Sequence, residues 1–260
     1  MKRTTLISVL VVALALVAAA CSSSDDESAG NLVTAGTLTV CTESPYEPFE
    51  FEDAAGPAGY SGFDIELINA IADENGLELA VANTPFDGIW LQPAAGACDI
   101  VASAMTITAE RAENALFSDP YFSADQSLLV LSSNSGLVLA DTGGMRIGVQ
   151  VGTTGEAYAE ENAPSDAELV SFDEGAALFL AIEAGDVDAI LQDLPVNGYR
   201  VTQDPKFQIA ETFTTDEQYG FAVSLDNTAL IRDINAALET LRDNGTYGDL
   251  HEKYFDTRGD

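Results

Sequence analysis

The chain has 260 residues, with 43 Asp or Glu against only 10 Lys or Arg, and its formal net charge is −33. Nucleic-acid binding requires Lys and Arg to neutralise phosphates, so this charge excludes a nucleic-acid partner. The excess of acid is consistent with attraction of cationic solutes and equally with adaptation to a salty medium.

Residues 1–21 have the pattern of an export signal. Lys2 and Arg3 precede an almost wholly apolar run, and small residues follow it immediately before Cys21. The run is short for a membrane span, and no charged stop follows it. We predict a signal peptide over 1–20. The segment also resembles a bacterial lipobox, which implies lipidation of Cys21; a plain secretory signal with an incidental cysteine is the alternative.

The next residues are small, polar and acidic, with nothing to bury. Such a composition predicts a flexible tether over 21–35, which would hold a folded domain near the outer face of a cell membrane. No later segment is long and apolar enough to span, so the lipid is the only membrane attachment we expect.

Two further cysteines, Cys41 and Cys98, follow the tether. An oxidising compartment favours a disulfide between them. If they lie on parallel neighbouring strands, however, they are too far apart for a bond that needs Cα atoms within about 7 Å. Both alternatives stay open. With His251 as the single histidine, we expect no metal and no cofactor.

Beyond Gly36, predicted strands and helices alternate, which favours βα units on mainly parallel sheets. The clearest helix covers 63–75, because Ile65, Ile68 and Ile71 share one face and Gly76 follows. The other predicted helices are 228–244 and 247–255, and the predicted strands are 37–41, 77–81, 99–102, 128–131, 146–151 and 187–191.

A pattern recurs in the chain. Residues 95–101 are echoed by 184–190, and 37–42 by 146–151. Two similar lobes explain this better than one sheet, although chance is a competing explanation. We predict that residues 36–124 and 222–260 form one lobe and 125–221 the other. The chain then crosses twice between the lobes, which implies a hinge and a cleft.

The most informative segment follows the predicted strand 99–102 and ends at Arg111. Ligands of open α/β sheets bind outside the carboxyl ends of the strands. A guanidinium there can bind a carboxylate through two parallel hydrogen bonds. A solvated or salt-bridged helix residue is the alternative interpretation of Arg111.

Further candidates lie in both predicted lobes. Residues 152–154 begin a helix, where free N–H groups form an anion site, or where Thr acts only as an N-cap. Asp193 ends a strand and either caps the next helix or receives an ammonium. Tyr46 and Phe86 lie in loops, where they pack over a ligand or in the core. Together these groups suit a zwitterionic amino acid.

The chain resembles the family 3 extracellular solute-binding proteins, which are polar amino-acid receptors of ABC importers. The likeness covers about residues 36–256 and rests on four segments, 62–67, 103–111, 117–121 and 247–255. It implies the type II periplasmic-binding-protein-like fold. In this α/β fold, two mainly parallel sheets form two lobes joined by a two-stranded hinge.

The resemblance implies roles at the two charged ends of an amino acid. Arg111, with the N–H groups of Thr106 and Thr154, would hold the ligand carboxylate. The Asp193 carboxylate, the Ala104 carbonyl and the Thr106 hydroxyl would take the ammonium.

Other residues would contact the ligand side chain. Tyr46 and Phe86 would sandwich it, and Glu43 and Gln150 would reach its distal end, where Glu43 suits a cationic or amide group. The complete predicted set is Glu43, Tyr46, Phe86, Ser103, Ala104, Thr106, Arg111, Gln150, Thr153, Thr154 and Asp193.

The expected function is capture of an amino acid such as Arg, Lys, His or Gln, closure of the hinge, and delivery to a membrane permease by a monomeric receptor. The main alternative is a cleft enzyme resembling cyclohexadienyl dehydratase. Against it, we find no nucleophile–histidine set and no paired carboxylates apart from acids that begin helices. A sensor ectodomain would need a transmembrane helix after the binding module, and none is expected before Asp260.

Overall fold

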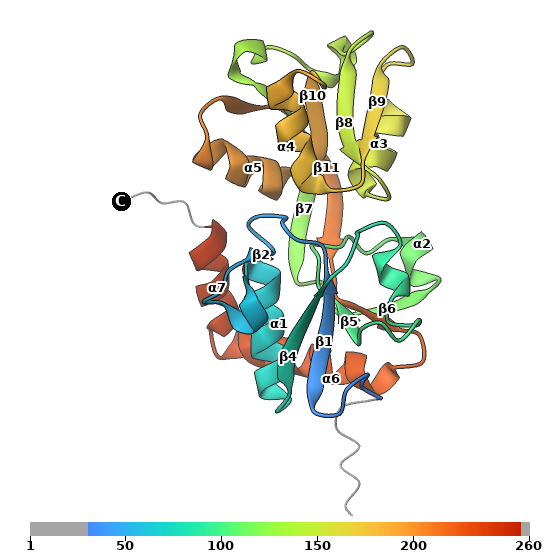
Figure 1. Ribbon diagram of the computed structural model, residues 1–260, viewed down its shortest axis with the longest axis vertical. Coiled ribbons are helices and arrows are strands. Elements are labelled where there is room, and N and C mark those ends of the chain that lie inside the picture. The colour runs from blue at the N-terminus through green and yellow to red at the C-terminus, as the bar shows by residue number, and fades with distance from the viewer. Residues whose placement is uncertain (1–30, 256–260) are drawn as a thin grey trace, which may run out of the picture.

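The computed structural model describes residues 31–255. The predicted signal peptide, Cys21 and the first part of the predicted tether lie outside them. Figure 1 shows two α/β bodies, one above the other, connected by the strands β7 (Phe122–Leu131) and β11 (Phe207–Tyr219). We call the body that contains β1 (Thr37–Thr42) lobe 1 and the body that contains β8 (Arg146–Gln150) lobe 2.

Each lobe is built on a five-stranded sheet with three adjacent parallel strands. In lobe 1 the order is β4 (Glu78–Asn83), β1 (Thr37–Thr42), β5 (Ile100–Val101), β12 (Ala222–Ser224), β6 (Ala115–Phe117). In lobe 2 it is β11 (Phe207–Tyr219), β7 (Phe122–Leu131), β10 (Ala189–Asp193), β8 (Arg146–Gln150), β9 (Glu168–Phe172). β2 (Phe51–Glu52) and β3 (Tyr60–Ser61) form a small separate ribbon.

Helices cover both sheets. They are α1 (Phe63–Glu74), α2 (Ala109–Ala112), α3 (Thr154–Asn162), α4 (Gly175–Ala184), α5 (Leu194–Gln203), α6 (Thr228–Asp243) and α7 (Thr246–Phe255). Single 3-10 turns lie at Pro57–Gly59, Ile89–Leu91, Ser132–Asn134 and Leu139–Asp141. As predicted, the last two helices pack on lobe 1, where both contact α1. No helix within residues 31–255 has the length and apolar character that a bilayer crossing requires.

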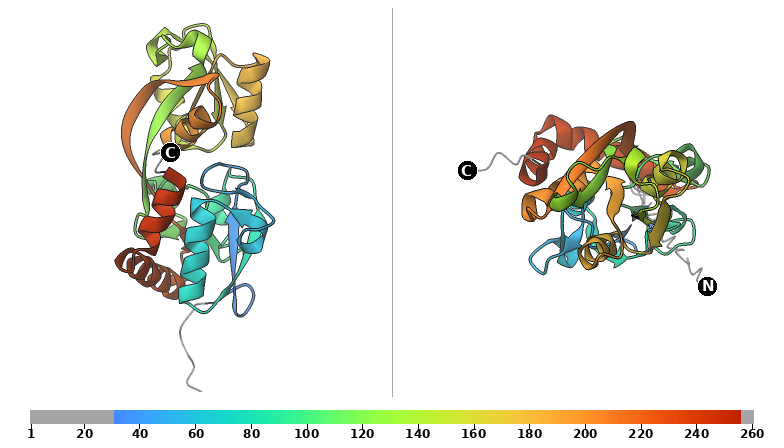
Figure 2. Two further views of the ribbon diagram at one scale, coloured as in Figure 1. Left: turned by 90° about the vertical axis from the view of Figure 1, so that its left-hand side faces the viewer. Right: turned by 90° about the horizontal axis from the view of Figure 1, so that it is seen from above.

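The long antiparallel strands β7 and β11 connect the lobes (Figure 2). The chain leaves lobe 1 between β6 and β7 and returns between β11 and β12. The lobe limits predicted from the sequence lie near these crossings and stay a prediction at the level of single residues. The predicted fold class, two mainly parallel sheets joined by two strands, is confirmed.

Local signals explain where the main helices begin. Gly62 precedes α1 with φ of 122°, and a Cβ there would lie 2.1 Å from the carbonyl oxygen of Phe49, so only glycine fits. The Asn227 side chain accepts a hydrogen bond from Leu230 N and caps α6. Both helices bury one apolar face in the core of lobe 1. The two helices also contact each other.

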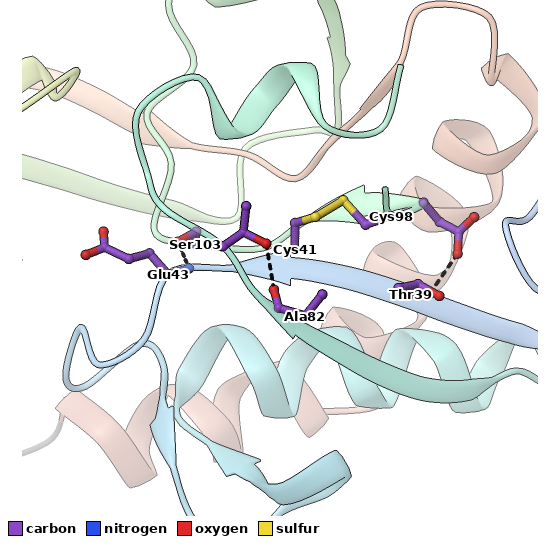
Figure 3. Close-up of a disulfide and its surroundings, with 8 residues drawn as sticks. Thr39, Cys41, Glu43, Ala82, Cys98 and Ser103 are labelled. Carbon is purple, nitrogen blue, oxygen red and sulfur yellow. Dashed lines mark hydrogen bonds between the residues drawn. A yellow bond between two sulfur atoms is a disulfide. The ribbon is translucent and has the colours of Figure 1, made fainter. Parts of the chain in front are cut away.

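The disulfide, which sequence reasoning left open, joins Cys41 and Cys98 (Figure 3). Their Cα atoms lie 5.8 Å apart even though β1 and β5 are parallel neighbours. The expected obstacle does not arise, because Cys98 precedes β5 and the next residue is bonded to β1. There, Asp99 N donates to Thr39 O at 2.8 Å. The chain therefore approaches the sheet beside Cys41.

The end of the predicted tether is held against lobe 1. Val33 N donates to Asp99 Oδ1 at 2.6 Å, and Asn227 Nδ2 donates to the carbonyl oxygen of Asn31 at 3.3 Å. Leu32 packs against the core of lobe 1. From Asn31 onward, then, the described chain is part of the lobe rather than a free linker.

Candidate ligand-binding site

A small cavity is lined by residues of both lobes. All the ligand-binding residues predicted from the sequence line it, and Glu50 is the one lining residue that was not predicted. Direct contacts cross it: Tyr46 of lobe 1 bonds to Asp193 of lobe 2, and Glu43 bonds to Gln150. The structure thus brings the predicted residues together, while their roles toward a ligand stay predictions.

Arg111 is buried, with only 4% of its surface exposed. Thr108 caps the short helix α2 by accepting a hydrogen bond from Arg111 N at 3.1 Å, which holds the backbone of Arg111. Arg111 Nη1 donates to the Thr106 carbonyl at 2.7 Å. Arg111 Nη2 donates across the lobes to the Gly152 carbonyl at 3.0 Å.

The guanidinium of Arg111 lies between two aromatic rings. Its carbon is 5.3 Å from the centre of Phe86 and 5.1 Å from that of Trp90. Phe86, which was predicted to pack over a ligand side chain, therefore contacts the Arg111 guanidinium. The matching contact of Trp90 was not predicted from the sequence. Burial lowers the pKa of Arg111. Within residues 31–255 no carboxylate forms an ion pair with this cation, so the arrangement favours an incoming anion.

Asp193 ends β10 and stands at the N-cap of α5, yet its side chain makes no capping bond. Instead it accepts hydrogen bonds from the Tyr46 hydroxyl at 3.0 Å, from Gln126 Nε2 at 2.6 Å and from the Tyr219 hydroxyl. Of the two roles considered from the sequence, the structure excludes capping. Burial, followed by the negative charge of Glu217, raises the pKa of Asp193 to about 6. This buried anion is suited to a cationic group.

Glu43 occupies another part of the cavity wall and contacts lobe 2. Its Oε2 accepts a hydrogen bond from Gln150 Nε2 at 2.6 Å, and its Oε1 accepts one from Gly175 N at 3.1 Å. A Cβ at position 175 would lie 3.0 Å from the Tyr46 ring, so glycine permits this close approach. Burial raises the pKa of Glu43. The result is a second buried acid that faces the cavity.

Glu50 is a third acid, which sequence reasoning missed. It is fully buried, and its Oε1 accepts a hydrogen bond from Ser103 Oγ at 3.1 Å. Ser103 Oγ in turn accepts from Glu43 N at 3.0 Å, the contact drawn in Figure 3. Oε2 of Glu50 has no hydrogen-bond partner among the described residues. Glu47, Glu52 and Asp53 are close to Glu50 in the chain, so the sequence carries no signal that singles it out.

Asp64 is a further buried acid close to this site. It lies in the first turn of α1 and is completely buried. Its Oδ2 accepts hydrogen bonds from Ala104 N at 2.7 Å and from the Tyr121 hydroxyl at 2.5 Å. Burial raises the pKa of Asp64 to about 7, and burial followed by the charge of Asp64 raises that of Glu50. Asp64 is one of the acids that begin helices, but its electrostatic interaction with Glu50 was not predicted.

This buried acid pair supports the loop that was predicted to contact the ligand. Glu50 holds Ser103 and Asp64 holds Ala104, whose φ of 43° is unusual for a residue with a side chain. The strained backbone is held in place by a charge-assisted bond to its own N–H group. As a result, the loop presents its groups in a fixed direction.

At the start of α3, Thr153 acts as an N-cap. Its hydroxyl accepts a hydrogen bond from Glu156 N at 3.0 Å and donates to the Gln150 carbonyl at 2.8 Å. Thr154 is the first residue of the helix, and its hydroxyl donates to Glu217 Oε2 at 2.6 Å. Thr153 and Thr154 both line the cavity, so the capping role and a place in the site coexist. Among residues 31–255, no three His, Cys, Asp or Glu side chains lie together in a way that could hold a metal ion.

The chain is similar in sequence and in fold to known amino-acid-binding proteins. The probable histidine-binding protein of Neisseria gonorrhoeae is 30% identical over 256 residues, which cover 94% of this chain and 93% of that protein. An ancestral arginine-binding protein bound to arginine has a TM-score of 0.78 and 37% identity, covering 85% of this chain and 98% of that one. An ancestral amino-acid-binding protein, a precursor of cyclohexadienyl dehydratase, has a TM-score of 0.78 and 37% identity, covering 85% and 96%.

The family model described as bacterial extracellular solute-binding proteins, family 3, matches residues 38–257. This match covers most of the chain and confirms the resemblance seen in the sequence. The chain belongs to the bacterial extracellular solute-binding proteins, family 3.

Proposed function

We propose that this protein captures a polar or basic L-amino acid between its two lobes and delivers it to a membrane permease of an ABC importer. One observation supports the proposal above all. Arg111 of lobe 1 and Asp193 of lobe 2 line the same cavity, and they can bind the two opposite charges of one zwitterion. The carboxylate would bind Arg111 and the amide groups of Thr106 and Thr154, and the ammonium would bind Asp193.

The charge of the cavity favours a cationic side chain. Three acids, Glu43, Glu50 and Asp193, line it against the single cation Arg111. After the two ends of the ligand are bound, the remaining acids face its side chain. Glu43 and Gln150 would contact the distal end, between the rings of Tyr46 and Phe86. The relatives named above for histidine and arginine support this choice.

The proposal includes the location of the protein. The family consists of extracellular proteins. We propose that the signal at 1–20 directs export and that lipidation at Cys21 attaches a monomeric receptor to the outer face of the cell membrane. Metabolic labelling with a radioactive fatty acid would test the anchor. The protein extracted with detergent should carry the label, and Cys21→Ala should not.

An enzyme of the same fold is the alternative, and the similarity to a precursor of cyclohexadienyl dehydratase is the observation that favours it. Against turnover, Arg111 and Asp193 together suit an intact amino acid. Of the two buried acids, Glu50 lines the cavity and accepts a hydrogen bond from Ser103, and Asp64, which does not line the cavity, accepts one from Ala104 N.

A thermal-shift screen of the twenty amino acids, followed by calorimetry, tests the function. We expect stabilisation by L-arginine, L-lysine, L-histidine or L-glutamine with micromolar affinity, which corresponds to roughly −8 kcal/mol. Prephenate and arogenate serve as the enzyme controls. Stabilisation by prephenate alone, with product formed on incubation, would refute the receptor in favour of the dehydratase.

A further inference from the structure

The hinge strand β11 contains an irregularity beside the cavity. Phe213 pairs with Gln126 of β7, and Glu217 pairs with Ala124, so β11 holds extra residues between the two pairs. Asp216, within this bulge, has φ of 54°, and Thr215 N is held by Asp125 Oδ1 at 3.0 Å. Bulges redirect side chains. Here the strained backbone of Asp216 directly precedes Glu217, whose side chain makes several hydrogen bonds.

That residue, Glu217, links the two lobes. Its Oε2 accepts hydrogen bonds from the Thr106 hydroxyl of lobe 1 at 2.7 Å and from the Thr154 hydroxyl of lobe 2 at 2.6 Å. Its Oε1 accepts from Gln126 Nε2 at 3.1 Å, and the same nitrogen donates to Asp193 Oδ1 at 2.6 Å. Glu217 does not itself line the cavity; it lies behind the two threonines, which do.

These contacts decide which way the two hydroxyls can bond. A threonine hydroxyl has one proton to donate and two lone pairs that accept. Glu217 takes the proton of both Thr106 and Thr154, so each hydroxyl can offer only lone pairs to a molecule in the cavity. The Thr154 hydroxyl already accepts from Gln126 Nε2 at 3.3 Å, which leaves it one lone pair for that molecule. Such hydroxyls accept from an ammonium and repel a carboxylate, which is then left to Arg111 and to backbone N–H groups.

We propose that Glu217 is a positioning residue that turns the Thr106 and Thr154 hydroxyls into acceptors for the ligand ammonium. The inference rests on the proposed amino-acid function and adds a residue that acts without touching the ligand. By holding one hydroxyl from each lobe, Glu217 also makes this acceptor pair available only when the lobes are together.

The test compares each amino acid with its des-amino counterpart. Calorimetry would measure L-arginine, L-histidine and their des-amino forms against the unaltered chain, Glu217→Ala and Glu217→Gln. The matched control is Glu239→Gln, which changes the same charge at an exposed position of α6. We expect Glu217→Ala to weaken the amino acids by about tenfold, the size of one charge-assisted hydrogen bond, and to leave the des-amino forms unchanged.

Glu217→Gln separates positioning from packing, because it conserves the shape of the side chain. Both threonine hydroxyls bond to the same oxygen of Glu217, so the amide oxygen can still accept from both, while the amide nitrogen takes the place of Oε1 and faces Gln126 Nε2. We therefore expect a smaller loss of about threefold for the amino acids. An equal loss for amino acids and des-amino forms would reduce Glu217 to a structural link and overturn the inference. Unchanged or tighter amino-acid binding would overturn it as well.

A double-mutant cycle with Thr154→Val supplies a second measure. If Glu217 acts through this hydroxyl, the two substitutions should cost less together than the sum of their separate effects. Additive losses would contradict the mechanism. Failure of the unaltered chain to bind any amino acid would instead remove the proposed function, and this inference with it.

Discussion

The two lobes repeat one another where their central strands begin. In lobe 1, Asp99 Oδ2 accepts from Thr39 N at 2.7 Å, and Asp99 N donates to Thr39 O at 2.8 Å. In lobe 2, Asp188 Oδ2 accepts from Arg146 N at 2.9 Å, and Asp188 N donates to Arg146 O at 2.8 Å. The sequence echo that suggested two lobes thus corresponds to the same backbone clamp in both.

The lobes differ where these strands end. Lobe 1 contributes the loop with Ser103 and Ala104, backed by buried acids, and the guanidinium of Arg111. Lobe 2 contributes a helix start at Thr154 and the carboxylate of Asp193. The repeated ends build the sheets, while the ends that differ face the cavity. This separation lets one scaffold present opposite charges to a single ligand.

The largest expected effect comes from removing the cation of lobe 1. Arg111→Ala would leave a desolvated ligand carboxylate unpaired, at a cost of about 2–5 kcal/mol in binding free energy. Calorimetry should find amino-acid binding nearly abolished. Arg146→Ala, which removes a half-exposed arginine of lobe 2, is the control and should leave affinity unchanged. Equal affinities for the two variants would contradict the assigned site.

The disulfide distinguishes the lobes in stability, because both of its cysteines belong to lobe 1. Replacing Cys41 and Cys98 by Ala removes a cross-link between residues 57 apart, and we expect a loss of about 3–4 kcal/mol. Chemical denaturation would measure it. Hydrogen exchange should show faster opening of lobe 1 than of lobe 2, and uniform acceleration of both lobes would argue against the assignment to one of them.

The two aspartate clamps should differ in strength. Asp99 is buried and also accepts from Val33 N, so Asp99→Ala leaves two amide groups without their partner at a cost of about 2–3 kcal/mol. Asp188 pairs with Arg146 near the surface, and Asp188→Ala should cost about 1 kcal/mol. Urea midpoints provide the comparison. Equal losses would show that burial does not set the difference.

The smallest effect is a pH dependence of binding. The pKa of Asp193 is raised to about 6, and a bound ammonium would favour its ionised form and lower that pKa. Binding should therefore release a proton near pH 6, and affinity should rise as the pH rises through this value and level off above it. A fall of about tenfold is expected for each pH unit below.

Calorimetry in buffers of different ionisation enthalpy would measure the released proton. Because Glu43 also titrates in the cavity, Glu43→Gln is the control, and the dependence near pH 6 should survive in it. If the pH dependence disappeared in Glu43→Gln, the titrating group would be Glu43 and not Asp193.

Local chemistry explains which elements could be predicted. The helix predicted over 63–75 is α1 (Phe63–Glu74), and that over 228–244 is α6 (Thr228–Asp243). Both have a strong cap or glycine signal and a regular apolar face. By contrast, β7 extends back to Phe122 from the predicted 128–131, and β11 was not predicted. Polar residues are frequent in the first half of β7 and throughout β11, and these parts form strands because they pair with each other over a long separation in the chain.

The residues that contact the cavity could be named from motifs, whereas those that support it could not. Glu50, Asp64 and Glu217 each hold a group predicted to touch the ligand, but each looks like an ordinary surface acid in the sequence. Their importance comes from burial and from partners such as Ser103 and Thr106 that are distant in the chain.

The amino-acid sequence alone determined three properties. Its net charge excludes nucleic acid, its alternating strands and helices predict α/β sheets, and it places a guanidinium and a carboxylate after buried strands. These properties are local, because they depend on residue type and on spacing within one element. Tertiary structure decided the disulfide, the single cavity shared by Arg111 and Asp193, and the hydroxyl bonds of Glu217. Each of these depends on segments that only the packing of the chain brings within hydrogen-bond or covalent distance.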